Sequence, residues 1–237
     1  MTKCVTLIFL AITLTLQAQS NDLSLANTFS DGIVLQREKL INVWGLANPN
    51  KSVTLNFGEE TKSIKADAKG KWSIKIGPLK ASSESRTMTI RSGKSEVKIA
   101  DIIVGEVWVC GGQSNMAWTL RGSTDADIEI SSANFNEIRF LKLPNIASPT
   151  KLDDFPIGKP TDWIGKWQKA ITPQVQNCSA VAYYFAKRLH RQLQVPVGII
   201  ENSWGGTMAQ HWCNKDTLRK IPEMAEDIKN FDEKYQE

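Results

Sequence analysis

The stretch that decides the fold is IIVGEVWVCGGQSN, residues 102–115. The run 102–110 is mostly apolar, which is typical of a buried strand. The glycines that follow it let the backbone turn sharply, because they have no Cβ. The turn then presents the hydroxyl of Ser114 at the carboxyl edge of a sheet, where α/β enzymes place their chemistry. The pattern is typical of a nucleophile, and the alternative is a plain strand-to-helix turn with Ser114 as a cap.

A second glycine turn follows a second apolar run. Residues 197–202 predict another buried strand, and Trp204-Gly205-Gly206-Thr207 comes directly after it. Because the carboxyl ends of parallel strands meet at one sheet edge, we expect this turn to converge on Ser114. One turn would carry the nucleophile and the other an oxyanion donor. The alternative for Gly205-Gly206 is an ordinary loop.

The chain has two halves of different texture. The first consists of short alternating strands separated by turn residues, which predicts a small antiparallel β-sandwich. These strands are expected at residues 33–36, 41–44, 52–57, 61–66, 71–76, 87–91 and 96–99. Beyond residue 102 strands alternate with helices, which predicts an α/β domain with a mostly parallel sheet.

Further elements are expected in the second half. Strands are predicted at residues 138–143 and 197–202, helices at 125–133, 179–193 and 223–237, and irregular structure between 144 and 171. The apolar face of the long helix should contain Val181, Tyr184, Phe185 and Leu189. The predicted fold class is therefore α/β, a small antiparallel β-sandwich followed by a parallel α/β domain.

The amino terminus predicts export. Lys3 precedes an apolar run from Val5 to Leu16, and a small-residue cleavage context ends at Ala18. This is the pattern of a signal peptide, because the run is too short to span a bilayer. We therefore divide the chain into a signal peptide, residues 1–18, a sandwich, 19–100, and the α/β domain, 101–237. The formal net charge of +4 is spread along the chain, so no nucleic-acid groove is indicated, and no later segment predicts a membrane span.

Cysteines and tryptophans complete the sequence expectations. Cys110, Cys178 and Cys213 have long, irregular spacings, which favours buried free thiols and argues against a zinc site. Five tryptophans lie in the second half. We expect Trp204, beside the glycine turn, to line the site. The other four should lie in the core, namely Trp118, Trp163, Trp167 and Trp212.

The chain resembles the sialate O-acetylesterases of the SGNH hydrolase superfamily. The resemblance is carried by VWVCGGQSNM, residues 107–116, and by VPVGIIENSWGGT, residues 195–207. In the first half, FSDGIVLQR at 29–37 and GKW at 70–72 resemble the β-rich domain that precedes the hydrolase domain in this family. The resemblance implies an SGNH-type, flavodoxin-like second domain that is incomplete here.

The family also implies a reaction. Ser114 would attack an acetyl ester on a sugar, with 9-O-acetylated sialic acid on a sialoglycan as the leading substrate, and no cofactor or metal would be needed. Backbone N–H groups of Ser114 and of Gly205 or Gly206 would hold the oxyanion. The residues expected to contact substrate are Gln113, Asn115, Trp204 and His211.

The family's general base is not found in the sequence pattern. A serine nucleophile needs a histidine, usually oriented by an aspartate, and the family supplies both from an Asp-x-x-His block. The chain has two histidines, His190 and His211, and the residues three before them are Lys187 and Met208. We therefore expect an amino-terminal portion of a longer esterase, with little activity by itself. The alternative is a non-catalytic carbohydrate-binding protein with a remnant hydrolase domain.

Overall fold

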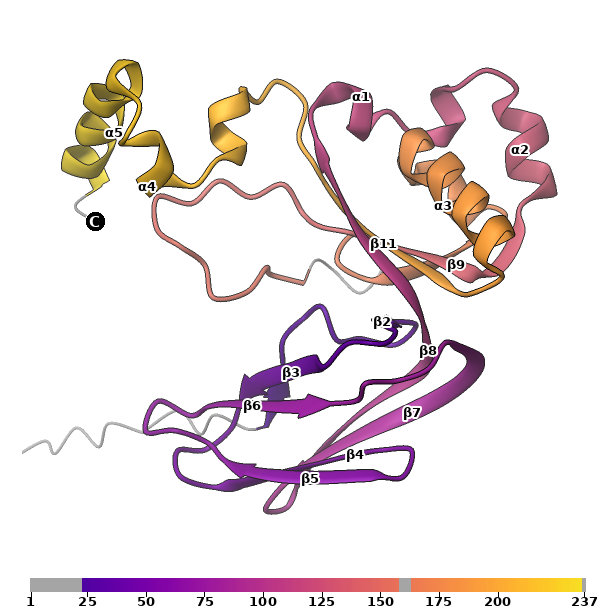
Figure 1. Cartoon of the computed structure of the whole chain (residues 1–237), viewed down its shortest axis with the longest axis vertical. Helices are drawn as coiled ribbons and strands as arrows, with labels where there is room; N and C mark the ends of the chain where they lie inside the picture. Colours follow the sequence, from indigo (N-terminus) through magenta and orange to yellow (C-terminus); the bar gives the residue numbers. More distant parts are fainter. Residues whose placement is uncertain (1–22, 158–162, 236–237) are drawn as a thin grey trace, which may run out of the picture.

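The computed structural model describes residues 23–157 and 163–235, and the predicted signal peptide lies outside them. Figure 1 shows a lower part made of strands and an upper part in which helices accompany strands. The predicted mixed α/β class is confirmed. Among the described residues, no helix has the length and apolar character needed to cross a bilayer.

The lower part is an antiparallel sandwich. One sheet has the order β1 (Ser24–Leu25), β3 (Ile41–Leu46), β6 (Lys71–Ile76). The facing layer contains β5 (Glu60–Lys65), β4 (Ser52–Phe57), β7 (Ser82–Ser92) and the first half of β8 (Ser95–Gly112). Every second residue of β4 and β6 is buried, such as Leu55 and Ile74, because successive side chains of a strand point to opposite faces. The predicted sandwich is confirmed.

Strand β8 corrects the expectation of two separate strands at residues 96–99 and 102–110. It runs without interruption from Ser95 to Gly112, with Asp101 in the left-handed region at φ 54°. The Asp101 carboxylate pairs with Arg139 at 2.9 Å and with Lys169 at 3.0 Å. Burial alone would raise the pKa of Asp101, but these two cations outweigh it and lower the pKa. Two cations from the upper part thus pair with β8 at its left-handed residue, Asp101.

The upper sheet is mostly parallel. The second half of β8 pairs with β11 (Val197–Ser203), which pairs on its other side with β9 (Asn134–Lys142), both in parallel. The outer strand β10 (Trp167–Ile171) pairs antiparallel with β9 and corrects the expected irregular structure at that place. The short strand β2 (Val34–Gln36) adds to β8 in parallel.

Helices α1 to α5 all lie in the upper part (Figure 1). They are α1 (Ser114–Ala117), α2 (Ala126–Ser132), α3 (Ala180–Leu193), α4 (Lys215–Leu218) and α5 (Pro222–Tyr235). Helix α3 begins after Ser179, whose Oγ accepts the N–H of Ala182 at 3.2 Å, as an N-cap does.

The face of α3 that packs inward differs from the expected one. The buried residues are Ala182, Tyr183 and Ala186, whereas Val181 and Phe185 are 51% and 39% exposed. Two alanines let the helix approach the sheet closely. Of the expected face, Val181, Tyr184 and Phe185 are exposed, whereas Leu189 packs partly against the core. Phe185 stacks edge to face on Trp108 at 5.2 Å.

Candidate active site

The two glycine turns come together at the carboxyl ends of β8 and β11. These neighbouring parallel strands end in register, with Ser203 opposite Gly112, so the segments that follow them leave the sheet at the same edge. The N–H of Trp204 donates to the carbonyl of Gly112 at 2.9 Å and ties the second turn to the first. The predicted convergence of the two turns is therefore present in the fold.

Ser114 is exposed and begins the short helix α1. A Cβ placed on Gly205 would lie 3.2 Å from its Oγ, so the hydroxyl lies directly against the second turn. The N-cap of α1 is Gln113 and makes no side-chain cap hydrogen bond. The alternative of Ser114 as a helix cap is thus not what the structure shows. Within residues 23–157 and 163–235, its hydroxyl has no hydrogen-bond partner.

The side chain of Gln113 links the two turns rather than pointing into open space. Its amide donates to the carbonyl of Thr207, and the hydroxyl of Thr207 accepts the indole N–H of Trp212 at 2.9 Å. Gly206 takes φ 80°, a region that glycine adopts without strain. These contacts hold the backbone of residues 204–207 beside Ser114. The substrate contacts predicted for Gln113 and for the exposed Asn115 and Trp204 remain predictions.

A buried carboxylate supports this edge of the sheet and was not predicted from the sequence. Glu201 is fully buried in β11 and pairs with Nζ of Lys142 at 2.9 Å. It also accepts the N–H of Ser179 and the hydroxyl of Ser203, each at 3.0 Å. The same carboxylate therefore holds the start of α3 and the end of β11 together. Its position directly after the apolar run 197–200 was the only signal in the sequence.

Glu201 also acts on the nearby thiols. Burial, and secondarily its negative charge, raises the pKa of both Cys110 and Cys178. The three cysteines of the described residues are free, as expected, but of the three only Cys178 is buried; Cys110 is partly buried and Cys213 is exposed. Among the described residues, no group of three or more histidine, cysteine, aspartate or glutamate side chains could hold a metal ion.

Within the described residues, neither histidine is hydrogen-bonded to Ser114. His211 is exposed, and its Nδ1 accepts the N–H of Met208 at 3.1 Å within a 3₁₀ turn, Ala209–Trp212. His190 lies near the end of α3, with Nδ1 2.7 Å from the carbonyl oxygen of Val195. Since β11 begins only two residues after Val195, His190 lies at the opposite edge of the sheet from Ser114.

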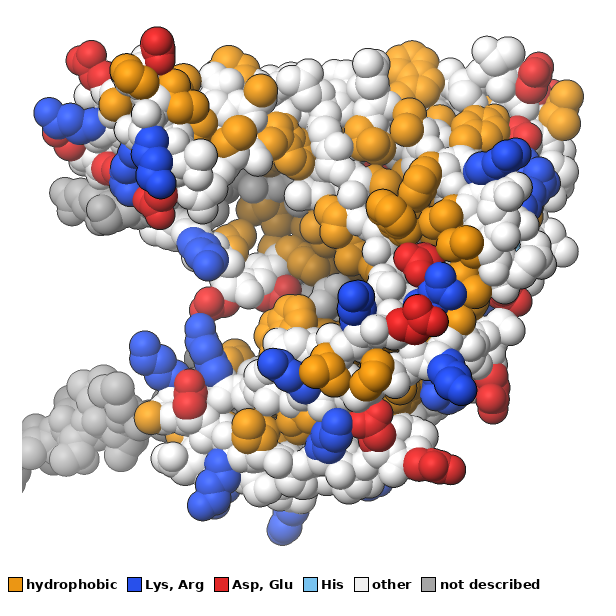
Figure 2. Space-filling view, in the orientation of Figure 1, with side chains coloured by type: hydrophobic (Ala, Val, Ile, Leu, Met, Phe, Trp, Pro, Cys, Tyr) orange, Lys and Arg blue, Asp and Glu red, His pale blue; other side chains and the backbone are white. Residues whose placement is uncertain are grey.

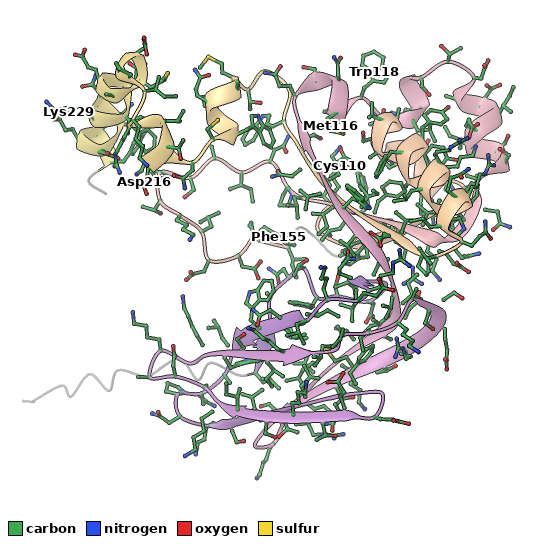
Figure 3. All side chains as sticks on the ribbon, in the orientation of Figure 1. Cys110, Met116, Trp118, Phe155, Asp216 and Lys229 are labelled. Carbon is green, nitrogen blue, oxygen red and sulfur yellow. The ribbon has the colours of Figure 1, made fainter. Side chains whose placement is uncertain are left out.

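The tryptophans follow the core expectation only in part. Trp167 is 6% exposed and lies in the core, as expected. Trp118 and Trp212 are 58% and 39% exposed and correct that expectation; Figure 3 shows Trp118 at the outer rim of the upper part. The ring of Trp212 lies 3.5 Å from the position that a Cβ on Gly111 would take. Trp204, at 37% exposure, and Trp212 therefore offer two indoles near the glycine turns.

Comparison with known proteins gives a consistent answer. The chain is 29% identical over 211 residues to sialate O-acetylesterases of Mus musculus and Homo sapiens, a match that includes 82% of this chain. It is also similar to the crystal structure of a carbohydrate acetylesterase from Xanthomonas citri, with a TM-score of 0.75, 31% identity and 82% of this chain covered. No family model matches.

These similarities extend over part of each relative. The chain spans 38% and 39% of the length of the mouse and human proteins and 43% of the Xanthomonas chain. Within that span, the structural match confirms that the sandwich and α/β arrangement is one that a carbohydrate acetylesterase uses.

Proposed function

We propose that this relative of the sialate O-acetylesterases carries the nucleophile of a serine esterase that removes acetyl groups from sugars. O-acetylated sialic acids, free or on a glycan, are the leading substrate. The observation that carries the proposal is the meeting of Ser114 with Gly205 at the ends of two parallel strands. The names of the mouse and human relatives and of the Xanthomonas acetylesterase support the substrate class.

The reaction would proceed through an acetyl-enzyme. Oγ of Ser114 attacks the acetyl carbonyl carbon, its proton goes to a general base, and the C–O bond to the sugar breaks as the sugar oxygen takes a proton. Water then attacks the acetyl-serine and releases acetate. The N–H groups of Ser114 and of Gly205 or Gly206 would hold the oxyanion, each worth about 3 kcal/mol. The reaction requires no metal or organic cofactor.

We further propose that the chain has little esterase activity by itself. A serine hydroxyl is a weak nucleophile until a base removes its proton. Nδ1 of His211 is already engaged by Met208, and His190 lies at the far edge of the sheet. Oxyanion stabilisation alone leaves only a small fraction of the triad's rate.

Chemical rescue tests both proposals. Hydrolysis of 4-nitrophenyl acetate and of 9-O-acetylated sialic acid is measured for the wild-type chain and for Ser114→Ala, with and without added imidazole. We expect slow turnover alone and a Ser114-dependent increase with imidazole, which can act as the absent base. Equal stimulation of both proteins would reject Ser114 as the nucleophile. Fast Ser114-dependent turnover without imidazole would instead reject the proposal that the general base is absent and would support the proposal that Ser114 is an esterase nucleophile.

Fluorophosphonate labelling separates an esterase site from a carbohydrate-binding module. We expect labelling at Ser114 in the presence of imidazole, located by peptide mass spectrometry. Gly205→Ala is the matched variant, because its new Cβ would lie 3.2 Å from Oγ of Ser114 and would displace it. Glycan binding with no labelling at Ser114 under any condition would favour the non-catalytic alternative.

Export through a signal peptide is a proposal that stands apart from the site. It predicts that the mature protein begins at Gln19 when the full gene is expressed in a secreting host. Amino-terminal sequencing of the secreted product tests it, and retention of Met1 would contradict it.

A further inference from the structure

A groove of about 710 Å³ lies over the sandwich, and neither Ser114 nor the two glycine turns are among its lining residues. Its floor is the outer face of β1, β3 and β6, and its side is formed by residues 153–154 from the segment after β9. Figure 2 shows the molecule hollowed between the sandwich and the part above it. This volume is within the range of sites that bind small ligands. In Figure 1, β3 and β6 lie in the lower part, whereas α1 is at the top.

The segment that closes the groove is attached to the sandwich. The carboxylate of Asp154 accepts the N–H of Asn27 at 2.7 Å, and the carbonyl of Phe155 accepts the side-chain amide of Asn27 at 2.5 Å. Phe155 packs against the sandwich core, and Figure 3 shows it between the loop and the strands below. Asp153 adds an ion pair with Lys71 at 3.2 Å. The groove is therefore a built feature with a fixed wall.

The floor of the groove presents an indole. Trp44 points outward from β3 and is 40% exposed. Its ring stands at 85° to the buried ring of Phe29, with the centroids 4.9 Å apart, so its orientation is held while part of its surface stays open. Trp72 is also among the lining residues, but its side chain belongs to the buried face of β6.

Polar side chains line the groove together with the indole. Asn42 and Ser73 lie on the same outer face and hydrogen-bond to each other, with Ser73 directly opposite Trp44 in the register. Of the charged residues lining the groove, three are aspartates and two are lysines, which gives a small excess of negative charge. The charged lining residues are Asp67, Asp153, Asp154, Lys65 and Lys71. An acidic sugar is disfavoured by that balance, and the hydroxyls of a neutral sugar are suited to carboxylate and amide acceptors.

We propose that this groove binds a neutral sugar unit of a glycan, with the pyranose ring stacked on Trp44 and its hydroxyls bonded to the surrounding acceptors. An aromatic platform with a few polar groups is the arrangement that orients such a ligand. The inference does not rest on the proposed esterase. It would allow the chain to hold a glycan at a place other than Ser114.

Binding of defined neutral oligosaccharides tests the proposal. Isothermal titration of the full chain uses cellotetraose, xylotetraose and N-acetyllactosamine as neutral probes and 3′-sialyllactose as the acidic one. We expect at least one neutral probe to bind more tightly than the acidic probe. Trp44→Ala should weaken that binding about tenfold or more, as loss of an aromatic anchor does, and Trp44→Phe should keep most of it.

The controls keep the result independent of folding and of hydrolysis. Trp108→Ala removes a comparably exposed indole, 44% against 40%, outside the groove and should leave binding unchanged. Asp153→Ala should weaken binding severalfold without unfolding, because that side chain is 88% exposed. Ser114→Ala should bind like the wild type. The proposal is overturned if no neutral probe binds, if Trp44→Ala and Asp153→Ala both bind normally, or if sialyllactose binds best.

Discussion

Neutralising Glu201 should destabilise the protein strongly. The substitution Glu201→Gln keeps the shape of the side chain and removes the charge that pairs with Lys142 at 2.9 Å. The ammonium of Lys142 would then lie in a site where that side chain is only 17% exposed. Removal of one partner from a buried pair costs about 3–5 kcal/mol. Because Lys142 keeps some access to water, we expect a loss of about 2–4 kcal/mol in the free energy of unfolding.

Urea unfolding at neutral pH, followed by circular dichroism, measures this loss as a lower midpoint with an unchanged slope. Glu96→Gln is the control, because its pairs with Arg91 and Lys98 are exposed and should be worth less than about 1 kcal/mol. Adding Lys142→Met to Glu201→Gln should recover part of the loss, since both charges are then gone. A Glu201→Gln protein no less stable than Glu96→Gln would refute the reasoning.

Three further predictions concern the strands and the thiols. Gly105→Ala would place a Cβ 1.9 Å from the carbonyl oxygen of Pro196 and should lower the free energy of unfolding in urea by about 2–4 kcal/mol. In the control Gly111→Ala, the nearest contacts of the new Cβ are at 3.5 Å, so the loss should be less than about 1 kcal/mol. Equal losses in the two variants would argue against the steric reason. The pKa of Asp101 is lowered in the folded state, so its charge stabilises the fold at pH values above the unfolded pKa of about 4. This stability is lost as the pH falls through the lower pKa of the folded state, so Asp101→Asn should make the free energy of unfolding depend less on pH in that range. An unchanged dependence on pH would contradict this prediction. Iodoacetamide should modify exposed Cys213 well before buried Cys178, whose raised pKa keeps the thiol protonated; peptide mapping by mass spectrometry with the order reversed would disprove it.

Local patterns were sufficient to predict much of the fold. The alternation in residues 52–57 and 71–76 predicted β4 and β6 with the bounds observed. The apolar runs followed by glycine turns predicted that β8 and β11 end beside each other. In each case the signal lies within a few neighbouring residues, because strand period and turn chemistry are local properties.

The remaining features depend on residues far apart in the sequence. Glu201 directly follows an apolar run, and its partners Lys142, Ser179 and Ser203 come from two strands and the start of a helix. The buried face of α3 was missed because the apolar periodicity favoured Val181, Tyr184 and Phe185, whereas the structure buries Tyr183 between two alanines, Ala182 and Ala186. Tertiary contacts decided these cases over local preference.

The continuity of β8 has a mechanical consequence. A strand of 18 residues spans about 60 Å when extended, and this one is hydrogen-bonded to β7 along its first half and to β11 along its second. Because β8 belongs to both halves of the molecule, unfolding of either half would remove a paired strand from the other. Force or denaturant applied to the sandwich should be transmitted along β8 to the turn that carries Ser114, so that both parts are lost in one cooperative transition.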